Sequence, residues 1–380
     1  MNSVTITFFS NFLLHHQTPF CESMVARIGE GFRFVATEPI PQERLDMGYL
    51  NFENVPYAVN SYKDKESYQK AMRLGYESDV VIIGSAPDVF IEKRIAENKM
   101  TFRYYERFFK KLRWRFDPRV WWHQYKRNIR YRNNDFYMLC AGAYTAKDCR
   151  FIHAFPNKTY KWGYFSEKPQ LTYEHFHKLK ENNDTIRILW ANRFVEWKHP
   201  EEVISLAQKL KRDKQSFQID MLGIGELREK YECIVKEKQL DDVICFSGPF
   251  SPQEVLKRMQ RSDIFLITSD KNEGWGVVVN EAMSSACAVV ACREIGSAPY
   301  LIEQGNNGLV YDKRDKNSLY KCVKQLLENK QFRERIQENG LNTIKENWNS
   351  EVAAERLLHL IHCLQNGTET GYVSGPCSRD

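Results

Sequence analysis

The chain has 380 residues, 42% of them hydrophobic and 27% charged, with a net charge of +6 at pH 7. These proportions exclude a disordered or fibrous protein, and no run approaches the roughly 20 apolar residues of a membrane-spanning helix, so we expect none. The length exceeds what one hydrophobic core usually serves, which predicts two domains.

The N-terminal half alternates strand-like and helix-like segments. Strands are expected at 4–9, 32–37, 80–83 and 136–140, and helices at 19–28, 65–74 and 117–129. No Lys or Arg precedes the first strand, so a secretory signal is not expected. The alternation predicts a mostly parallel sheet covered by helices, which we assign to a Rossmann-like domain over residues 1–165.

A second, clearer series begins near residue 185. Strands are expected at 186–191, 217–221, 243–246, 264–268, 288–291 and 308–310, with helices at 200–211, 226–238, 252–260 and 277–285. This is an α/β, doubly wound domain over residues 185–349, joined to the first by a linker at 166–184. Two such Rossmann-like domains would face each other across a cleft at the carboxyl ends of their strands.

The C-terminal end follows the second domain. A terminal helix is expected at 350–365 and is expected to pack back on the first domain. Residues 366–380 are rich in Gly, Thr and Ser, which predicts a flexible tail.

Cysteine and histidine usage bears on compartment and metals. The ten cysteines include no Cys-x-x-Cys pair, as is typical of free thiols in a reducing compartment, so we expect a cytoplasmic protein. His175-x-His177 and His359-x-x-His362 lack the supporting ligands of a zinc site. No metal site is predicted.

Residues 268–283 lead from a buried strand through a polar loop and a Gly-Trp-Gly turn into a helix. A helix N-terminus offers unpaired N–H groups to an anion such as a diphosphate, and Gly274 and Gly276 would let the backbone approach it. Glu273 stands just before the expected helix and Glu281 about two turns in. Ionised carboxylates accept hydrogen bonds from sugar hydroxyls. The alternative is a helix-capping acid followed by a solvated surface acid.

A second strand-to-helix loop lies at residues 190–200. Arg193 and Lys198 would stand at the carboxyl edge of the sheet, where both can neutralise phosphate. The alternative is a surface cluster of ion pairs with Glu196 and Glu201.

These motifs resemble those of the retaining glycosyltransferases of glycosyltransferase family 4, which have the GT-B fold. Glu273 and Glu281 match the family's Glu, seven residues, Glu motif, and Arg193 with Lys198 matches its Arg, four residues, Lys pair. Supporting matches lie at 223–226, 246–248, 262–263, 295–302 and 306–309. The resemblance covers about residues 185–350.

The resemblance implies a role for each matched residue. Glu273 would hold hydroxyls of the transferred sugar, Glu281 would hold the ribose hydroxyls, and Arg193 and Lys198 would bind the donor diphosphate. The implied catalytic residues are Glu273, Arg193 and Lys198. Further donor contacts are assigned to Gly274, Trp275, Gly276, Val277, Gly223, Gly225, Phe246 and Phe250. The substrate would be a nucleoside diphosphate sugar, with no cofactor and no metal, in keeping with the lack of an Asp-x-Asp motif.

The first domain departs from the family pattern. Members often carry a Gly-Gly loop after the first strand, where this chain has residues 10–19 without glycine. We expect Asn11, His15 or His16 to contact the donor phosphate or the acceptor. Histidines that only cap or pack the loop are the alternative.

Residues 93–132 hold 14 Lys or Arg against three acids. From residue 103 to 132 the cations alternate with large aromatic side chains, as in helices that lie in a membrane interface. A solvated helix with a packed aromatic face is the alternative. Nucleic-acid binding is not expected, because no recognition module accompanies the basic residues.

Together these features predict a retaining hexosyl- or N-acetylhexosaminyltransferase that uses a nucleotide sugar. The acceptor would be a glycan or lipid-linked saccharide held by the first domain, in cell-surface polysaccharide or glycoconjugate synthesis, by a peripheral protein on the inner face of the membrane. A nucleotide-sugar epimerase on the same fold and a non-catalytic nucleotide-sugar-binding protein are the alternatives.

Overall fold

The computed structural model describes residues 4–46, 48–110, 112–181 and 185–380. Its contacts divide the chain into two compact units. The first unit comprises Met1–Glu167 and Asn349–Asp380, and the second comprises Lys168–Trp348. Each is described by itself below.

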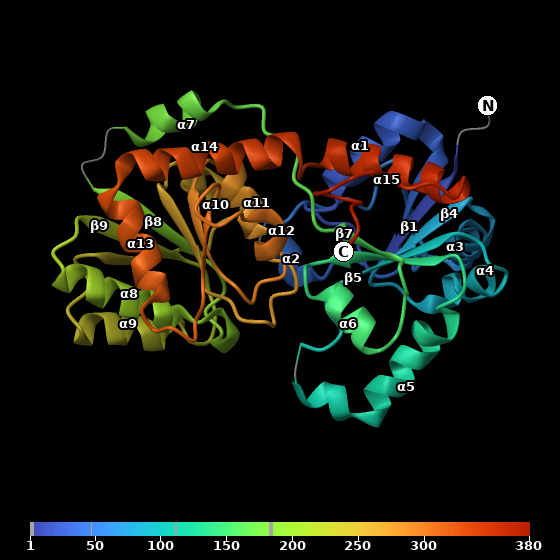
Figure 1. Ribbon diagram of the computed structural model, residues 1–380, viewed down its shortest axis with the longest axis horizontal. Helices are drawn as coiled ribbons and strands as arrows, with labels where there is room; N and C mark the ends of the chain where they lie inside the picture. Colours follow the sequence, from blue (N-terminus) through green and yellow to red (C-terminus); the bar gives the residue numbers. More distant parts are fainter. Residues whose placement is uncertain (1–3, 47, 111, 182–184) are drawn as a thin grey trace. The chain divides into compact units, whose positions relative to one another are not determined.

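The first unit contains a seven-stranded parallel sheet in the order β3-β2-β1-β4-β5-β6-β7. The strands are β1 (Ile6–Ser10), β2 (Phe32–Ala36), β3 (Ala58–Asn60), β4 (Val80–Ile83), β5 (Thr101–Tyr105), β6 (Phe136–Ala141) and β7 (Thr159–Trp162). The helices are α1 (Thr18–Ile28), α2 (Gln42–Asp46), α3 (Lys65–Glu77), α4 (Glu92–Ala96), α5 (Pro118–Arg127), α6 (Thr145–Phe151) and α15 (Ser350–Gln365). Figure 1 shows α1 and α15 side by side.

The second unit contains a six-stranded parallel sheet in the order β10-β9-β8-β11-β12-β13. The strands are β8 (Ile186–Ala191), β9 (Phe217–Leu222), β10 (Ile244–Ser247), β11 (Ile264–Ile267), β12 (Ala288–Cys292) and β13 (Leu309–Tyr311). The helices are α7 (Tyr173–Lys180), α8 (Pro200–Arg212), α9 (Arg228–Glu237), α10 (Pro252–Gln260), α11 (Val278–Ser284), α12 (Ala298–Leu301), α13 (Ser318–Glu328) and α14 (Lys330–Glu346).

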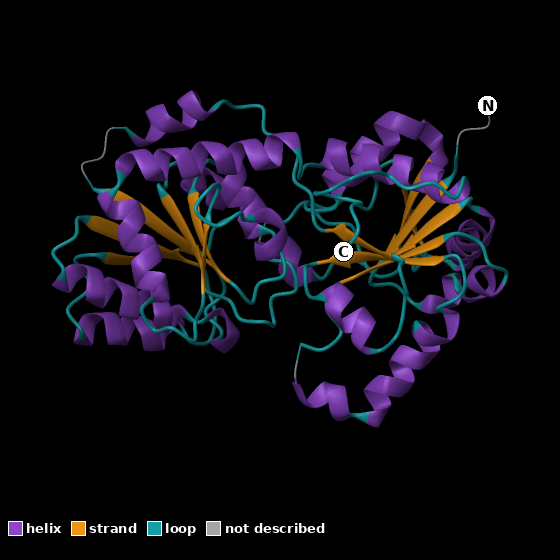
Figure 2. Cartoon of the chain, in the orientation of Figure 1, coloured by secondary structure: helices purple, strands orange, loops and turns teal. Residues whose placement is uncertain are grey.

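Helices cover both faces of each sheet (Figure 2), so the central strands are buried on both sides and read as continuous apolar runs, such as Val80–Ile83 and Ile264–Ile267. In both sheets the strand order reverses next to the first strand, between β1 and β4 and between β8 and β11. Open parallel sheets bind ligands beside the carboxyl ends of the strands at such a reversal. The prediction of two doubly wound Rossmann-like domains is confirmed.

The segment expected as a linker is partly helical. Within it, α7 packs on the second unit, where the Lys180 ammonium donates to the carbonyls of Ser285 at 3.3 Å and Ala286 at 2.5 Å. The sequence analysis assigned no helix to this linker, and α7 forms there because buried contacts of Phe176 hold it. Residues 182–184 of the expected linker lie outside the described residues.

The prediction of a flexible tail was also wrong. Residues 366–380 return to the edge of the first sheet, where Arg379 forms an antiparallel bridge with Tyr160. The Lys161 N–H donates to the Ser378 carbonyl, and the Cys377 N–H donates to the Lys161 carbonyl, both at 2.8 Å. Cys377 and Ser378 are fully buried. Backbone hydrogen bonds to the edge of β7 order this polar segment, and its composition does not reveal them.

Candidate functional site

The loop that carries Arg193 leaves the carboxyl end of β8 and is held by backbone contacts. The Asn192 N–H donates to the Leu222 carbonyl at 3.0 Å, and the Phe194 N–H donates to the Ile224 carbonyl at 2.8 Å. Gly223 lies against this loop with φ +135°, and a Cβ there would stand 2.0 Å from the Asn192 carbonyl oxygen. The glycine therefore positions the Arg193 loop, and the donor contact expected from sequence at Gly223 stays a prediction.

Gly225 has the same function two residues further along the chain. Its φ is +148°, and a Cβ would lie 2.5 Å from the carbonyl oxygen and 2.7 Å from the nitrogen of Phe194. Only a residue without a side chain fits at this distance. Two glycines thus lock the loop in place.

Lys198 and Glu273 form an ion pair at the β8/β11 reversal. The ammonium donates to Oε2 of the carboxylate, and both side chains are largely buried, with 10% and 16% of their surface exposed. Burial lowers the pKa of Lys198, and the charge and hydrogen bond of Glu273 oppose that shift. The predicted contact of Lys198 with Glu196 or Glu201 does not occur, so the surface-cluster alternative fails for this residue.

The main chain of Lys198 is anchored as well. Its carbonyl accepts a hydrogen bond from the Thr268 hydroxyl at 2.5 Å, and Trp190 Nε1 donates to that hydroxyl at 2.8 Å. Trp190 and Thr268 are fully buried. The ion pair is therefore fixed to the ends of β8 and β11.

Arg193 is exposed, and its charge acts on Lys198 by lowering its pKa further. Neither Glu196 nor Glu201 forms an ion pair with Arg193, since Glu201 instead accepts from His199 at 2.7 Å. Lys198 and Arg193 carry two positive charges, and Glu273 neutralises one of them. The remaining positive charge can bind an anion.

The helix expected after the Gly-Trp-Gly turn is present as α11, but Glu281 lies nearer its start than predicted. The helix begins at Val278, and Glu281 therefore lies in its first turn instead of two turns in. Gly276 has φ +84°, and a Cβ would lie 3.0 Å from Ile295 Cγ2 and 3.3 Å from Glu273 Cγ. Gly276 thus supports the position of Glu273, and both acids of the motif lie at the same end of α11.

Trp275 is not placed to contact a ligand through its side chain. The ring is 1% exposed, and its Nε1 donates to Asn280 Oδ1 at 2.9 Å. It packs against Tyr300 and Trp348, with ring centroids 6.1 and 5.9 Å away. A donor contact at Trp275 would therefore be made by its backbone N–H group, as is expected at Gly274 and Val277.

Glu281 is partly buried, and this burial raises its pKa to about 7. At neutral pH a carboxyl group with this pKa is partly protonated, so a small change in its surroundings shifts its charge. Hydroxyl donors of a ligand would favour the ionised form. This property suits a group that meets a ribose only when the donor is bound.

Phe246 lies in β10, and Phe250 follows that strand. Phe246 packs on Phe194 at 5.7 Å, and Phe250 lies under the Arg258 guanidinium at 4.1 Å. The sequence missed Arg228, whose Nη1 donates to the carbonyls of Gly223 at 2.7 Å and Gly248 at 3.0 Å. Arg228 therefore joins the carboxyl ends of β9 and β10.

A polar cluster beside Lys198 was also missed. His199 adopts φ +49° at the start of α8, and its Nε2 lies 3.0 Å from Lys313 Nζ and 3.4 Å from Asp270 Oδ2. The hydrogen bond that His199 donates to Glu201 is the main cause of the raised pKa of His199. These side chains come from β8, β11 and β13 loops that are far apart in sequence, so no local pattern joins them.

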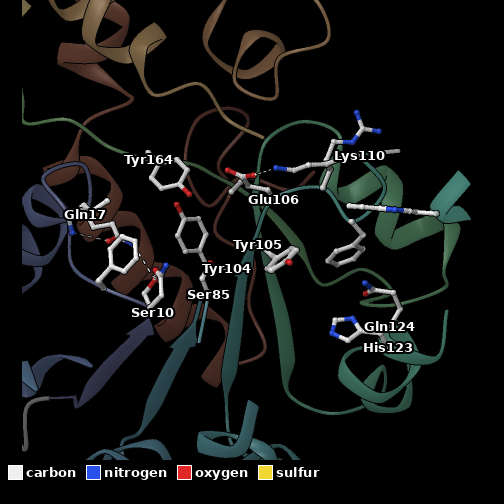
Figure 3. A pocket seen from close by; sticks show the side chains of 18 of the residues that line it. Ser10, Gln17, Ser85, Tyr104, Tyr105, Glu106, Lys110, His123, Gln124 and Tyr164 are labelled. Carbon is white, nitrogen blue, oxygen red and sulfur yellow. Dashed lines mark hydrogen bonds and ion pairs between the residues drawn. The ribbon is translucent and has the colours of Figure 1, made fainter. Parts of the chain in front are cut away.

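The first unit contains a cavity of about 830 Å³ at the carboxyl ends of its central strands (Figure 3). Ser10 and Asn11 line it after β1, Ser85 after β4, and Tyr105 with Glu106 at the end of β5. Its position is the β1/β4 reversal. The structure thus brings Asn11 to a ligand-sized space.

The two histidines of this loop differ. His16 lines the cavity and His15 does not. The His16 ring packs edge-on against Tyr164 at 4.9 Å, and burial lowers its pKa to about 3. Burial, and then the charge of Arg44, lowers the pKa of His15. Both imidazoles are therefore neutral at pH 7, and His16 alone faces the cavity.

Two cations of the basic segment, Arg94 and Arg103, are buried, and its other described cations are partly or fully exposed. Asp88 accepts from Arg103 at 3.1 and 3.0 Å and from Arg127 at 2.7 Å at both oxygens. Arg103 is 1% exposed, and Arg94 is fully buried among carbonyl oxygens. These arginines are structural and add nothing to a surface charge. Lys111 of this segment lies outside the described residues.

The outer face of α5 is different. Trp122 and Tyr125 are 58% and 48% exposed and stack at 5.7 Å, with Lys126 Nζ 4.9 Å from the Trp122 centroid. Phe116, just before the helix, is 78% exposed. We call Phe116, Trp122, Tyr125 and Lys126 the aromatic face.

Among the residues described, no helix is long and apolar enough to cross a bilayer, and no group of three or more His, Cys, Asp or Glu could hold a metal ion.

Residues 172–343 match the family model of glycosyl transferases group 1. Over these residues the chain is similar to group 1 glycosyltransferases. The chain is similar to an uncharacterized glycosyltransferase of Methanocaldococcus jannaschii, with 26% identity over 191 residues, 50% of this chain and 48% of that protein. It is also similar to the amylovoran biosynthesis glycosyltransferase AmsK of Erwinia amylovora, with 31% identity over 140 residues, 35% of this chain and 34% of that protein. The chain thus matches less than half the length of these relatives.

Solved structures extend the likeness of fold over both units. Sucrose-phosphate synthase from Thermosynechococcus elongatus superposes with a TM-score of 0.69 at 14% identity, covering 96% of this chain and all of that one. Anabaena HepE in complex with UDP gives 0.70 at 12% identity, covering 94% and 100%. The chain therefore has the GT-B fold of glycosyltransferases. Membership of family 4 in particular stays a prediction.

Proposed function

We propose that the protein transfers a sugar from a nucleoside diphosphate sugar to a saccharide acceptor, with retention at the anomeric carbon. The observation that carries this proposal is the buried Lys198–Glu273 ion pair beside Arg193 at the β8/β11 reversal. A diphosphate that leaves the sugar gains negative charge, and fixed cations stabilise that charge in the transition state. Lys198 is held in place for this by the ends of two strands.

Glu273 has two tasks in this scheme. Its Oε2 orients the Lys198 ammonium, and its remaining acceptor capacity takes hydrogen bonds from hydroxyls of the transferred sugar. Arg193 contacts the diphosphate from its exposed position, and Glu281 accepts from the ribose. Phe246 and Phe250 lie near the base. In a retaining transfer the acceptor hydroxyl attacks from the face that the diphosphate leaves, so the diphosphate oxygens can accept the hydroxyl proton.

The first unit would hold the acceptor. Hydroxyl, amide and phenol groups of Ser10, Asn11, Gln17, Tyr104 and Tyr105 line its cavity, and such groups with aromatic walls suit a saccharide. The named role of AmsK in amylovoran biosynthesis supports a glycan or lipid-linked acceptor and a part in polysaccharide synthesis. The aromatic face supports attachment to an anionic membrane surface. We expect no nucleic acid as a partner.

A glutamine at position 273 tests this function. Glu273→Gln keeps the size of the side chain but removes the charge that orients Lys198, and we expect kcat for nucleoside diphosphate release from the donor to fall by about 10² to 10³-fold. The donor would first be found by a thermal-shift screen of nucleotide sugars. Glu229→Gln, an exposed residue of α9, is the matched control and should retain full activity.

The same assay distinguishes the two alternatives. An epimerase would convert the donor into another nucleotide sugar without releasing nucleoside diphosphate, and a binding protein would do neither. Full turnover in Glu273→Gln, or either alternative outcome in the unaltered protein, would refute the proposal.

A further inference from the structure

The cavity of the first unit holds more positive than negative charge. Four cations and two acids line it. Lys110 Nζ pairs with Glu106 at 2.8 Å, as Figure 3 shows, and Arg119 pairs with Asp117 at 3.0 Å. Both acids are therefore already neutralised within the wall.

The two other cations differ in their partners. Arg107 lies over the Tyr144 ring and 3.9 Å from the buried Asp148 carboxylate. Arg44 has no acid. Its guanidinium lies 5.4 Å from the Phe12 centroid and 5.8 Å from that of Tyr49, and none of the described carboxylates forms an ion pair with it. A guanidinium stacked on two rings keeps its donors available at the edge.

The groups near Arg44 do not compensate its charge. The charge of Arg44 helps to lower the pKa values of His15 and His16, after burial and, for His16, after the charge of His15. Neutral imidazoles leave the guanidinium uncompensated. The remaining lining near β1 and β4 consists of hydroxyl and amide groups of Ser10, Asn11 and Ser85.

We propose that this cavity binds a saccharide that carries a phosphate or carboxylate group, with Arg44 as the contact to that anion. The inference rests on the proposed function, because it names the acceptor class of the same enzyme. Arg–phosphate and Arg–carboxylate pairs are charge-assisted and bidentate, which explains why a cation stands without an acid here. The neutral polar wall would contact the sugar.

The anion could instead be the donor's own diphosphate, and the experiment must separate the two sources. Binding of glucose 1-phosphate, inorganic phosphate and methyl glucoside would be measured by calorimetry, with the nucleoside diphosphate from the donor screen present at saturation. Glucose 1-phosphate should bind at least tenfold more tightly than either other probe. Arg44→Gln should reduce its affinity about tenfold, and the exposed Arg73→Gln should leave it unchanged.

Three outcomes would overturn the inference. Arg44→Gln could bind glucose 1-phosphate as the unaltered protein does, inorganic phosphate could bind equally well, or the substitution could weaken the nucleoside diphosphate instead. Failure of the sugar-transfer proposal looks different, because it appears as absent turnover while Arg44-dependent binding of glucose 1-phosphate persists. Glu273→Gln, in turn, should leave glucose 1-phosphate affinity unchanged.

Discussion

The two strand-order reversals have the same topology but are built differently. In the second unit, the Arg193 loop is fixed by main-chain hydrogen bonds and by two glycines that no side chain could replace. In the first unit, a cavity of about 830 Å³ is walled by side chains from β1, β4, β5, α2 and α5. Backbone contacts thus determine the shape of the edge in the second unit, whereas side chains determine the shape of the edge in the first.

This difference fits the two expected ligands. A nucleoside diphosphate presents the same phosphates and ribose whatever sugar it carries, so a rigid backbone frame serves it. Acceptors vary, and a cavity lined by exchangeable side chains can change specificity without disturbing the sheet. We therefore expect the second unit to tolerate substitution less well than the first at corresponding positions.

The largest expected effect is that of Gly223→Ala. The new Cβ would stand 2.0 Å from the Asn192 carbonyl oxygen at φ +135°, so the Arg193 loop must move. The positive φ costs about 1 kcal/mol and the clash about 2 more, and donor affinity should fall more than tenfold. Urea denaturation and donor calorimetry would measure the two effects.

Gly305→Ala provides the matched control in the same unit. Gly305 also has a positive φ, +76°, but a Cβ there meets nothing within 4 Å. Its substitution should cost only about 1 kcal/mol, with donor affinity unchanged. Equal effects of the two substitutions would show that the loop contact does not matter.

A smaller effect concerns the charge of Glu281. Because burial raises its pKa in the folded protein to about 7, from 4.5, its contribution to stability is fully present below pH 4.5 and is lost as pH rises through 7. Glu281→Gln does not titrate, so its free energy of unfolding relative to the unaltered protein should rise by about 2 kcal/mol between pH 5 and pH 8. Urea denaturation at four pH values would measure this. Parallel curves for the two proteins would contradict it.

The contrast between the edges also explains what sequence could predict. Glu273, Lys198 and Arg193 lie in short strand-to-helix loops. A local pattern therefore predicts their place at one edge of the sheet, whereas the Lys198–Glu273 ion pair was not predicted. The steric role of Gly223 could not be predicted, because it depends on the backbone of Asn192, 31 positions earlier in the chain, and its donor contact stays a prediction.

In the first unit, the local signals were weaker. His15 and His16 are adjacent in sequence, yet only one lines the cavity. The places of Arg44 and Asp88 could not be predicted from the sequence. Arg44 lies against aromatic rings and forms no ion pair with the described carboxylates, and Asp88 joins Arg103 to Arg127, which are far from it in the chain. Likewise Arg103 reads as a basic surface residue until its buried pairing with Asp88 is seen.

The smallest effect tests whether the first unit meets a membrane beside its cavity. In α5, Val120, His123 and Gln124 line the cavity, whereas Trp122 and Tyr125 are exposed. Trp122→Ser should weaken binding to phosphatidylglycerol–phosphatidylcholine vesicles about fivefold at low salt, roughly 1 kcal/mol, and sedimentation would measure this. Tyr68→Ser, an exposed aromatic on α3, is the control and should bind normally. If the unaltered protein does not sediment with these vesicles, the aromatic face is no membrane surface, and the acceptor must reach the cavity from solution.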